Sequence, residues 1–353
     1  MPRWLFALLF LIALPVLIAL PARADELPSL HLKVVGGLGQ TIQFKNFEEP
    51  FWSKQLAERS GGRITAEVTP WDQFGIKGAE LLQFTRLGAI AISTVSLSQI
   101  SSEDPEAAAV DLAGLNSDIP TLRHSIKEYL PTLREVYRSR YGLELLAIWS
   151  YPAQVIFCNK PITSLADLKG VNVRVASGMH ADFINGLGGV GITIPFDRLM
   201  DALNKHVADC AITGAMSGYR VGLQNATTHL DPVTVSWGPY VLFANRAAWL
   251  RFDPKVRDFL TAQIDELGDR LWDAADRENQ EGIACLTGVG TCTAGPPGHM
   301  TLVPVTAEDR KLMRQSFTDV VSPRWSERCG AECVANWNNT IGRLFNITVA
   351  ASR

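Results

Sequence analysis

The sequence has few cysteines, little net charge and no run of basic residues. Only six of its 353 residues are cysteine, too few for a small fold built from disulfides. The formal net charge is −3, and no lysine or arginine cluster offers an electrostatic surface for nucleic acid. The composition, 47% hydrophobic and 20% charged, excludes disordered and collagen-like chains. A chain of this length is expected to form roughly two domains of about 150 residues each.

Local catalytic and nucleotide-binding motifs are also missing. The sequence has no Gly-x-Ser-x-Gly, no His-Glu-x-x-His and no phosphate loop, and its six histidines are scattered singly. Residues 186–191 match the dinucleotide-binding glycine spacing, but they are expected to follow a helix and lead into a strand, the reverse of the order that binds phosphate. We therefore expect a binding protein without cofactor or metal. A secreted enzyme with a site assembled from distant residues is the alternative.

The first 24 residues have the pattern of a secretory signal peptide. Arg3 provides a positive start, residues 4–20 are almost entirely apolar, and residues 22–24, Ala-Arg-Ala, form a cleavage site. We predict cleavage after Ala24 and export of the mature chain. The alternative is an uncleaved membrane anchor, because the apolar run is just long enough to span a bilayer.

Export would place the cysteines in an oxidising compartment, where disulfides persist. Cys285 lies close in sequence to Cys292, and Cys329 lies close to Cys333. We predict that these residues form two short-range disulfides.

The other two cysteines, Cys158 and Cys210, leave two possibilities open. They would pair if two strands bring them together, and otherwise both would be buried thiols. A zinc site with His299 near Cys285 and Cys292 is a further alternative, but that spacing matches no standard zinc module.

Strand and helix patterns alternate along the first part of the chain. Strands are expected at 30–36, 64–68 and 89–95, with helices at about 42–60 and 77–87 between them. This order is typical of an α/β layered domain.

A second α/β unit is expected at about 155–230. Between the units, Asp118 is expected to cap a first helix, and a second would begin at about Pro131 and stop at Gly142. After Asp253 the sequence predicts a helix of roughly 30 residues, on the order of 45 Å at 1.5 Å per residue. Such a helix is long enough to lie across both units.

Arg174 is the most informative residue of the sequence. It lies within a strand pattern, 171–175, whose apolar neighbours are expected to be buried. An unpaired buried charge is very costly, so the guanidinium needs a partner. Either an internal carboxylate pairs with it, or it binds the carboxylate of a ligand through two hydrogen bonds.

The segment that contains Arg174 resembles a known family. Residues 162–175, Ile-Thr-Ser-Leu-Ala-Asp-Leu-Lys-Gly-Val-Asn-Val-Arg-Val, are similar to the Asp-Leu-Lys-Gly-x-Lys-x-Arg-Val signature of the DctP-type solute receptors of TRAP (tripartite ATP-independent periplasmic) transporters. The similarity covers most of residues 30–290, with further matching motifs, in order, at 60–64, 73–75, 86–88, 203–209 and 245–249.

The resemblance implies an α/β, two-lobed periplasmic binding protein, type II-like, with a long helix spanning both lobes. We expect lobe I at 25–150, lobe II at 151–240, a crossover segment with the long helix at 241–300, and a C-terminal helical segment at 301–353. The protein would be a periplasmic monomer or dimer that works with the membrane subunits of a TRAP transporter.

The resemblance also implies a binding site for a small organic acid. In this family the arginine at the position of Arg174 forms a salt bridge with the ligand's carboxylate. The other pocket positions implied by the family's pattern are Gly37, Gln73, Gln154, Phe196, Thr213, Trp237 and Asn245.

The sequence departs from the family's pattern in one important respect. Many members carry a second arginine in the strand before the signature, whereas residues 153–159 have none and Gln154 is the nearest polar candidate. With one cationic anchor, a monocarboxylate with an apolar or aromatic body fits better than a dicarboxylate or a sialic acid. A receptor for an ABC importer or a sensory system is the alternative function.

Overall fold

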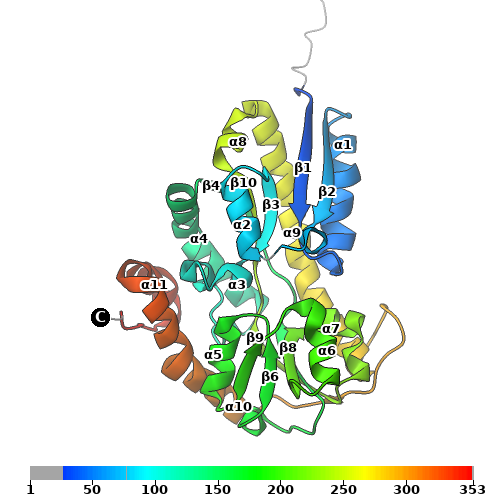
Figure 1. Ribbon diagram of the computed structural model, residues 1–353, viewed down its shortest axis with the longest axis vertical. Coiled ribbons are helices and arrows are strands. Elements are labelled where there is room, and N and C mark those ends of the chain that lie inside the picture. The colour runs from blue at the N-terminus through cyan, green and yellow to red at the C-terminus, as the bar shows by residue number, and fades with distance from the viewer. Residues whose placement is uncertain (1–26, 77, 352–353) are drawn as a thin grey trace, which may run out of the picture.

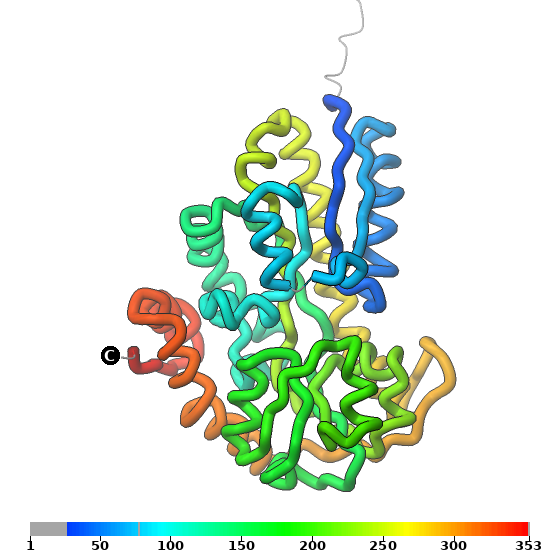
Figure 2. Tube along the Cα trace, viewed as in Figure 1, coloured from blue at the N-terminus to red at the C-terminus, as the bar shows by residue number. Residues whose placement is uncertain are grey.

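The computed structural model describes residues 27–76 and 78–351, which form two lobes, each built on one β-sheet (Figure 1). Figure 2 shows that the chain passes from the upper lobe to the lower one and returns. The predicted signal peptide and its cleavage after Ala24 lie outside the described residues. No described helix is long and apolar enough to cross a membrane.

The sheet of lobe I has five strands in the order β2-β1-β3-β10-β4. Strand β1 pairs in parallel with β2 and β3, whereas β10 is antiparallel to both β3 and β4. The three strands predicted in this region are confirmed. The bounds are β1 (Leu30–Gly36), β2 (Ile64–Pro70), β3 (Ile92–Ser96), β4 (Leu143–Trp149) and β10 (Tyr240–Asn245).

A continuous helical run follows β1, as predicted, and it packs on this sheet through buried Phe51 and Trp52. The run consists of the π-helical turns η1 (Gln43–Glu48) and η2 (Phe51–Gln55) and of α1 (Leu56–Arg59). The shorter helices of lobe I are η3 (Trp71–Phe74), α2 (Gly78–Arg86), α3 (Leu97–Ile100) and η4 (Pro105–Ala108).

One long helix, α4 (Ile119–Tyr141), replaces the two helices expected on either side of Pro131. Asp118 caps it as predicted, accepting a hydrogen bond from the Thr121 amide at 2.8 Å, and Gly142 ends it with a φ of 64°. Proline removes only one hydrogen bond of the helix ladder. The buried residues Leu133 and Tyr137 beyond it keep the helix packed on the core, so the prediction of a break was wrong.

The sheet of lobe II has six strands in the order β11-β9-β5-β8-β6-β7. Their bounds are β5 (Gln154–Cys158), β6 (Asn172–Val175), β7 (Val190–Thr193), β8 (Cys210–Gly214), β9 (His229–Ser236) and β11 (Thr301–Leu302). The helices of this lobe are η5 (Leu165–Leu168), α5 (Gly178–Gly186), η6 (Phe196–Arg198), α6 (Leu199–Asn204), α7 (Ala215–Val221) and η7 (Leu223–Asn225).

The two lobes are connected by the β4–β5 and β9–β10 links and by the predicted long helix, α9 (Pro254–Thr287). After α8 (Arg246–Arg251), α9 packs first on lobe I, where the Trp272 Nε1–H donates to the Ile148 carbonyl at 3.0 Å. It then crosses α7 so closely that a Cβ on Gly282 would lie 2.3 Å from the Met216 nitrogen.

The C-terminal segment is mainly helical, as expected, although β11 at its start joins the sheet of lobe II. The helix nearest its middle, α11, contacts both lobes, because Arg324 forms a 2.8 Å ion pair with Asp182 of α5 while Trp325 reaches η4. The elements are α10 (Ala307–Ser316), η8 (Phe317–Val321), α11 (Ser322–Trp337), η9 (Asn338–Gly342) and α12 (Arg343–Phe345).

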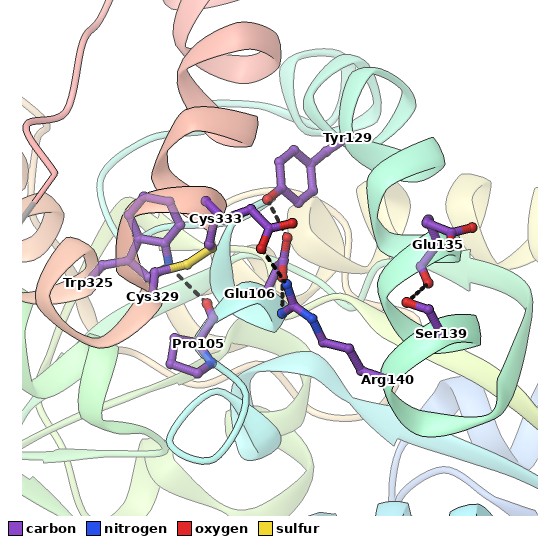
Figure 3. Close-up of polar contacts among 10 residues, drawn as sticks. Pro105, Glu106, Tyr129, Glu135, Ser139, Arg140, Trp325, Cys329 and Cys333 are labelled. Carbon is purple, nitrogen blue, oxygen red and sulfur yellow. Dashed lines mark hydrogen bonds and ion pairs between the residues drawn. A yellow bond between two sulfur atoms is a disulfide. The ribbon is translucent and has the colours of Figure 1, made fainter.

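Figure 3 shows how α11 is attached to lobe I. The Trp325 Nε1–H donates to the Pro105 carbonyl at 2.8 Å. Next to it, the buried Glu106 carboxylate accepts hydrogen bonds from the Tyr129 hydroxyl at 3.0 Å and from Arg140 at 2.9 Å. These contacts fix the C-terminal segment on the outside of α4.

All six cysteines lie in the described residues and form disulfides. The two predicted pairs, Cys285–Cys292 and Cys329–Cys333, are confirmed. The third pair joins β5 to β8, in whose antiparallel register Cys158 lies directly opposite Cys210. The zinc alternative is wrong, because both of its cysteines are oxidised; across residues 27–76 and 78–351 there is no cluster of three metal-binding side chains.

Candidate functional site

Arg174 lies at the centre of β6, between β7 and β8, with 1% of its surface exposed. Its Nε–H donates to the Ile194 carbonyl at 2.8 Å, and its Nη1–H donates to the Ile212 carbonyl at 3.0 Å. These bonds hold the guanidinium across three strands. Among the described residues, Nη2 has no hydrogen-bond partner.

No carboxylate of the described chain forms an ion pair with Arg174. Burial lowers the pKa of Arg174 to about 10, and the exposed Asp197 acts in the opposite direction through its charge. The guanidinium therefore stays charged at neutral pH, stabilised by the two carbonyl groups and by the charge of Asp197. Of the two partners that the sequence left open, an internal carboxylate is not found among the described residues, and a ligand anion stays a prediction.

Two predicted site residues lie close to Arg174. Thr213 of β8 is two residues from Ala211, the register partner of Arg174, so both side chains project from the same face of the sheet. Phe196 is half-buried and follows Ile194, whose carbonyl holds Arg174. Their roles in binding stay predictions.

Gln154 begins β5, at the edge of this sheet that faces lobe I. It lies opposite Gly214 of β8 and Ser236 of β9, and its Nε2–H donates to the Pro152 carbonyl at 3.1 Å. It is only half-buried, so its side chain can turn toward a ligand. Arg174 and Thr213 thus share one face of the sheet, whereas Gln154, as the register partner of Gly214, projects from the other face.

A residue that the sequence did not single out, His180, also lies in this part of the lobe. Its Nε2 is 2.7 Å from the Ser236 hydroxyl, and its Nδ1 has no partner among the described residues. Burial and the positive charge of Arg174 lower the pKa of His180 to about 4. The imidazole is therefore neutral at physiological pH, so Arg174 is the cation of this region.

Trp237 is packed in the core instead of in a cleft. It is 2% exposed, its amide donates to the Asp111 carboxylate at 2.8 Å, and its indole Nε1–H donates to the Asn116 carbonyl at 3.2 Å. The Gly238 amide binds the same carboxylate at 2.9 Å. These contacts give Trp237 a structural role in the β9–β10 link, and we omit it from the proposed site.

Asn245 lies at the wrong end of lobe I for a shared site. Strand β10 begins at Tyr240, opposite Ser96 at the carboxyl end of β3, and runs away from lobe II. The Asn245 amide donates to the carbonyls of Thr85 and Arg86, both at 3.1 Å, and its oxygen caps α8. Every polar atom of this side chain is used by the fold, so the expected ligand role is replaced by a capping role.

The two predicted positions of lobe I lie at the edge of its sheet that points toward lobe II (Figure 1). Gly37 follows β1, and its amide donates to the Glu48 carboxylate at 3.0 Å. Gln73 lies in η3, just beyond β2, and is exposed. Both therefore stay candidates for contact with a ligand.

Sequence reasoning missed a buried carboxyl group beneath Gly37. Glu48 is fully buried, and its Oε2 accepts hydrogen bonds from Gly37 and from the Thr94 hydroxyl, the latter at 2.8 Å. Its Oε1 has no hydrogen-bond partner within residues 27–76 and 78–351. Burial raises the pKa of Glu48 to about 7 in spite of the two hydrogen bonds.

A second buried carboxyl group is that of Glu278 of α9. Burial is the main cause of the raised pKa of Tyr151, and the charges of Glu48 and Glu278 together raise it further. The Gln43 amide donates to Glu278 Oε2 at 2.8 Å, and burial raises the pKa of Glu278 to about 7. The Tyr151 ring packs against that of Tyr240, with centroids 4.0 Å apart. No sequence motif marks the four residues of this group, because they come from four separate segments of the chain: Gln43, Tyr151, Tyr240 and Glu278.

The chain is similar to bacterial solute-binding proteins over most of its length. A family model described as bacterial extracellular solute-binding protein, family 7 (DctP), matches residues 40–327. The C4-dicarboxylate-binding periplasmic protein DctP of Rhodobacter capsulatus is 25% identical over 288 residues, which is 80% of this chain and 83% of that protein. The sialic acid-binding periplasmic protein SiaP of Vibrio cholerae is 23% identical over 221 residues, 61% of this chain and 67% of that protein.

Solved structures with the same fold support the predicted two-lobed architecture. DctP7, a Bordetella pertussis extracytoplasmic solute receptor that binds pyroglutamic acid, superposes with a TM-score of 0.77 at 19% identity, covering 88% of this chain and 99% of that one. A TRAP solute-binding protein from Desulfovibrio salexigens with bound orotic acid also gives 0.77 at 17% identity, covering 89% and 99%. The fold class expected from the sequence is confirmed, and the chain belongs to family 7 of the bacterial extracellular solute-binding proteins.

Proposed function

We propose that this protein is a periplasmic receptor of a TRAP transporter, which captures a small organic acid between its lobes for uptake by separate membrane subunits. The observation that carries the proposal is Arg174, a buried and charged guanidinium without an anionic partner in the described chain. An acid that enters between the lobes would provide that partner, with two parallel hydrogen bonds from a guanidinium already held in place.

The relatives support an acidic ligand. The Rhodobacter capsulatus protein is named for C4-dicarboxylates, and structural neighbours carry pyroglutamate, orotate, galacturonate or succinate. These compounds differ in size and in ring structure but share a carboxylate. Arg174 accounts for that shared group, and the ligand's remaining atoms would be chosen by the residues around it.

Arg174 belongs to lobe II only, so a ligand bound to it is expected to favour closure of the lobes if it also contacts lobe I. A ligand that contacts both lobes binds the closed form more tightly than the open form, so it shifts the population toward closure. The links that follow β4 and β9 would bend, and α9 would keep the lobes aligned. No bond of the ligand changes in this scheme, and the receptor is expected to release its ligand chemically unchanged.

The experiment that tests the proposal is a thermal-shift screen of the mature protein against about a hundred organic acids. A ligand at about a hundredfold its Kd should stabilise the protein by roughly 2.7 kcal/mol, an easily measured shift. Arg174→Ala is expected to abolish every shift. Arg198→Ala, which removes an exposed arginine of the same lobe, is the matched control and should keep them. Stabilisation that survives in Arg174→Ala would contradict the anchor role.

Two further observations separate this function from its alternatives. Adjacent genes for two integral membrane subunits would support a TRAP system, whereas an adjacent ATPase gene would indicate an ABC importer. Mass spectrometry of ligand recovered from denatured protein separates a receptor from an enzyme, because a receptor returns the compound unaltered.

N-terminal sequencing of exported protein is expected to begin at Asp25 if cleavage follows Ala24.

A further inference from the structure

The surroundings of Glu48 form a second polar site, in lobe I, which we call the Glu48 site and define as Gly37, Glu48, Thr94 and Tyr151. Glu48 Oε2 accepts two hydrogen bonds, from the amide of Gly37 and the hydroxyl of Thr94. Glu48 Oε1 is fully buried and accepts none. A buried carboxylate oxygen without a donor is destabilising, and such oxygens are uncommon in folded proteins.

The free oxygen lies next to a position that only glycine can occupy. A Cβ on Gly37 would come within 2.6 Å of Glu48 Oε1 and within 2.8 Å of the Tyr151 hydroxyl oxygen. The φ of Gly37 is not in the left-handed region, so backbone conformation does not require glycine here. The absence of a side chain instead leaves both oxygens next to the end of β1.

The Glu48 site lies at the end of its sheet where ligands of α/β proteins bind. Gly37 follows the carboxyl end of β1, and Thr94 is the middle residue of the neighbouring strand β3. In open α/β sheets the binding crevice lies outside the carboxyl ends of the strands. Tyr151 belongs to the link between β4 and β5, so it is the member of the Glu48 site that comes from the connection between the lobes.

The two lobes therefore present opposite chemistry. Lobe II has Arg174, a donor-only group with a free Nη2, and lobe I has Glu48, whose free Oε1 accepts hydrogen bonds when the group is ionised. A second carboxylate of a ligand would bring two acceptors together at Oε1. An N–H or O–H would instead satisfy that oxygen.

We propose that Glu48 selects the ligand by accepting a hydrogen bond from it, so that the substrate is an organic acid with one carboxylate and, at its other end, an N–H or O–H donor. This assignment rests on the proposed function, because Arg174 must hold the carboxylate. Glu48 Oε1 and the Tyr151 hydroxyl lie beside Gly37, and a ligand would reach Oε1 through a movement of the β4–β5 link that carries Tyr151.

The test uses pairs of acids that differ in one donor. 3-Hydroxypropionate is compared with propionate, 4-hydroxybutyrate with butyrate, and 4-hydroxybenzoate with benzoate, so that each pair has one carboxylate and differs only in a hydroxyl at the opposite end. Titration calorimetry measures Kd for the wild type, for Glu48→Gln and for Glu67→Gln, which changes an exposed glutamate of β2. Glutamine keeps the acceptor for Gly37 and Thr94 but places an NH2 donor where Oε1 was.

For the wild type and Glu67→Gln, the donor-bearing acid of at least one pair is expected to bind tenfold or more tightly than its partner. Glu48→Gln is expected to lose that preference or reverse it, while a thermal melt confirms that it is folded. Equal binding within every pair that binds, or an unchanged preference in Glu48→Gln, would overturn the role of Glu48 but leave Arg174 as the anchor. If no acid binds, the proposed function fails, and this assignment fails with it.

Discussion

Arg174 in lobe II and Glu48 in lobe I are both buried, and neither has an oppositely charged partner in the described chain. Burial affects the charge of these two side chains differently. Burial leaves Arg174 with a pKa of about 10, so it stays a cation, whereas it raises the pKa of Glu48 to about 7, where the charge is divided between two forms. A buried arginine thus stays a cation at neutral pH, whereas a buried glutamate with a pKa near 7 accepts a ligand's hydrogen bond at Oε1 in its ionised form.

Of the variants that test this comparison, Arg174→Ala is expected to have the largest effect, which is on ligand affinity. Removing one partner of a buried, hydrogen-bonded charge pair costs on the order of 2–5 kcal/mol. We therefore expect both members of every acid pair to lose affinity together, by roughly 30-fold or more. Titration calorimetry checks this, and an Arg174→Ala protein that weakened only the donor-bearing acids would show that the two residues have exchanged the roles assigned to them.

A smaller effect concerns stability against pH and isolates Glu48. Its pKa is about 7 in the folded protein and near 4.5 in the unfolded chain, so between these values the folded state retains a proton that the unfolded state has lost. The free energy of unfolding should therefore fall as pH rises from 5 to 8. Glu48→Gln removes this contribution, which is on the order of 3 kcal/mol at full burial.

Urea denaturation at pH 5 and pH 8 measures that difference. Asp111 and Glu278 also have pKa values raised to about 7 by burial, but they remain in both proteins and cancel in the comparison. Glu67→Gln serves as the exposed control. The same pH slope in wild type and Glu48→Gln would mean that Glu48 does not titrate in this range.

The smallest effect is expected at Asn245, which the family pattern suggested but the structure places far from both charged groups. Asn245→Ala removes the cap of α8, and losing such a cap costs about 1 kcal/mol. We expect a lower Tm with an unchanged Kd for every acid. Weaker binding without a change in Tm would show that Asn245 contributes to ligand binding and contradict its assignment as a helix cap alone.

The sequence predicted Arg174 but not Glu48, and the difference has a physical cause. Arg174 places a charged side chain within an apolar strand pattern. Side chains alternate strictly along a strand, so such a charge can be recognised in the sequence alone. Glu48 follows Lys45 and precedes Glu49, both exposed, in a helix whose polar positions resemble an ordinary solvated face. Only the approach of β1 and β3 from elsewhere in the chain encloses its carboxyl group.

Other features of the fold can also be separated into those that local sequence signals predict and those that depend on distant parts of the chain. Alternating strands, glycine stops and the cap at Asp118 are local signals, and the structure confirms them. The continuation of α4 through Pro131 depends on packing against the core, which overrides a local signal for a break. Likewise, Trp237 and Asn245 match the family's pattern in sequence, but their hydrogen bonds to distant segments give them structural roles.

The path of α9 has a mechanical consequence for how the lobes move. The helix is fastened to lobe I where Trp272 binds Ile148 and to lobe II where Gly282 lies on Met216. Any rotation of one lobe against the other must be absorbed as bending of the stretch between those two points. Glu278 lies in that stretch and accepts a hydrogen bond from Gln43 of lobe I, so bending of the helix there would also displace this contact. The stiffness of one helix would then set how far the receptor opens.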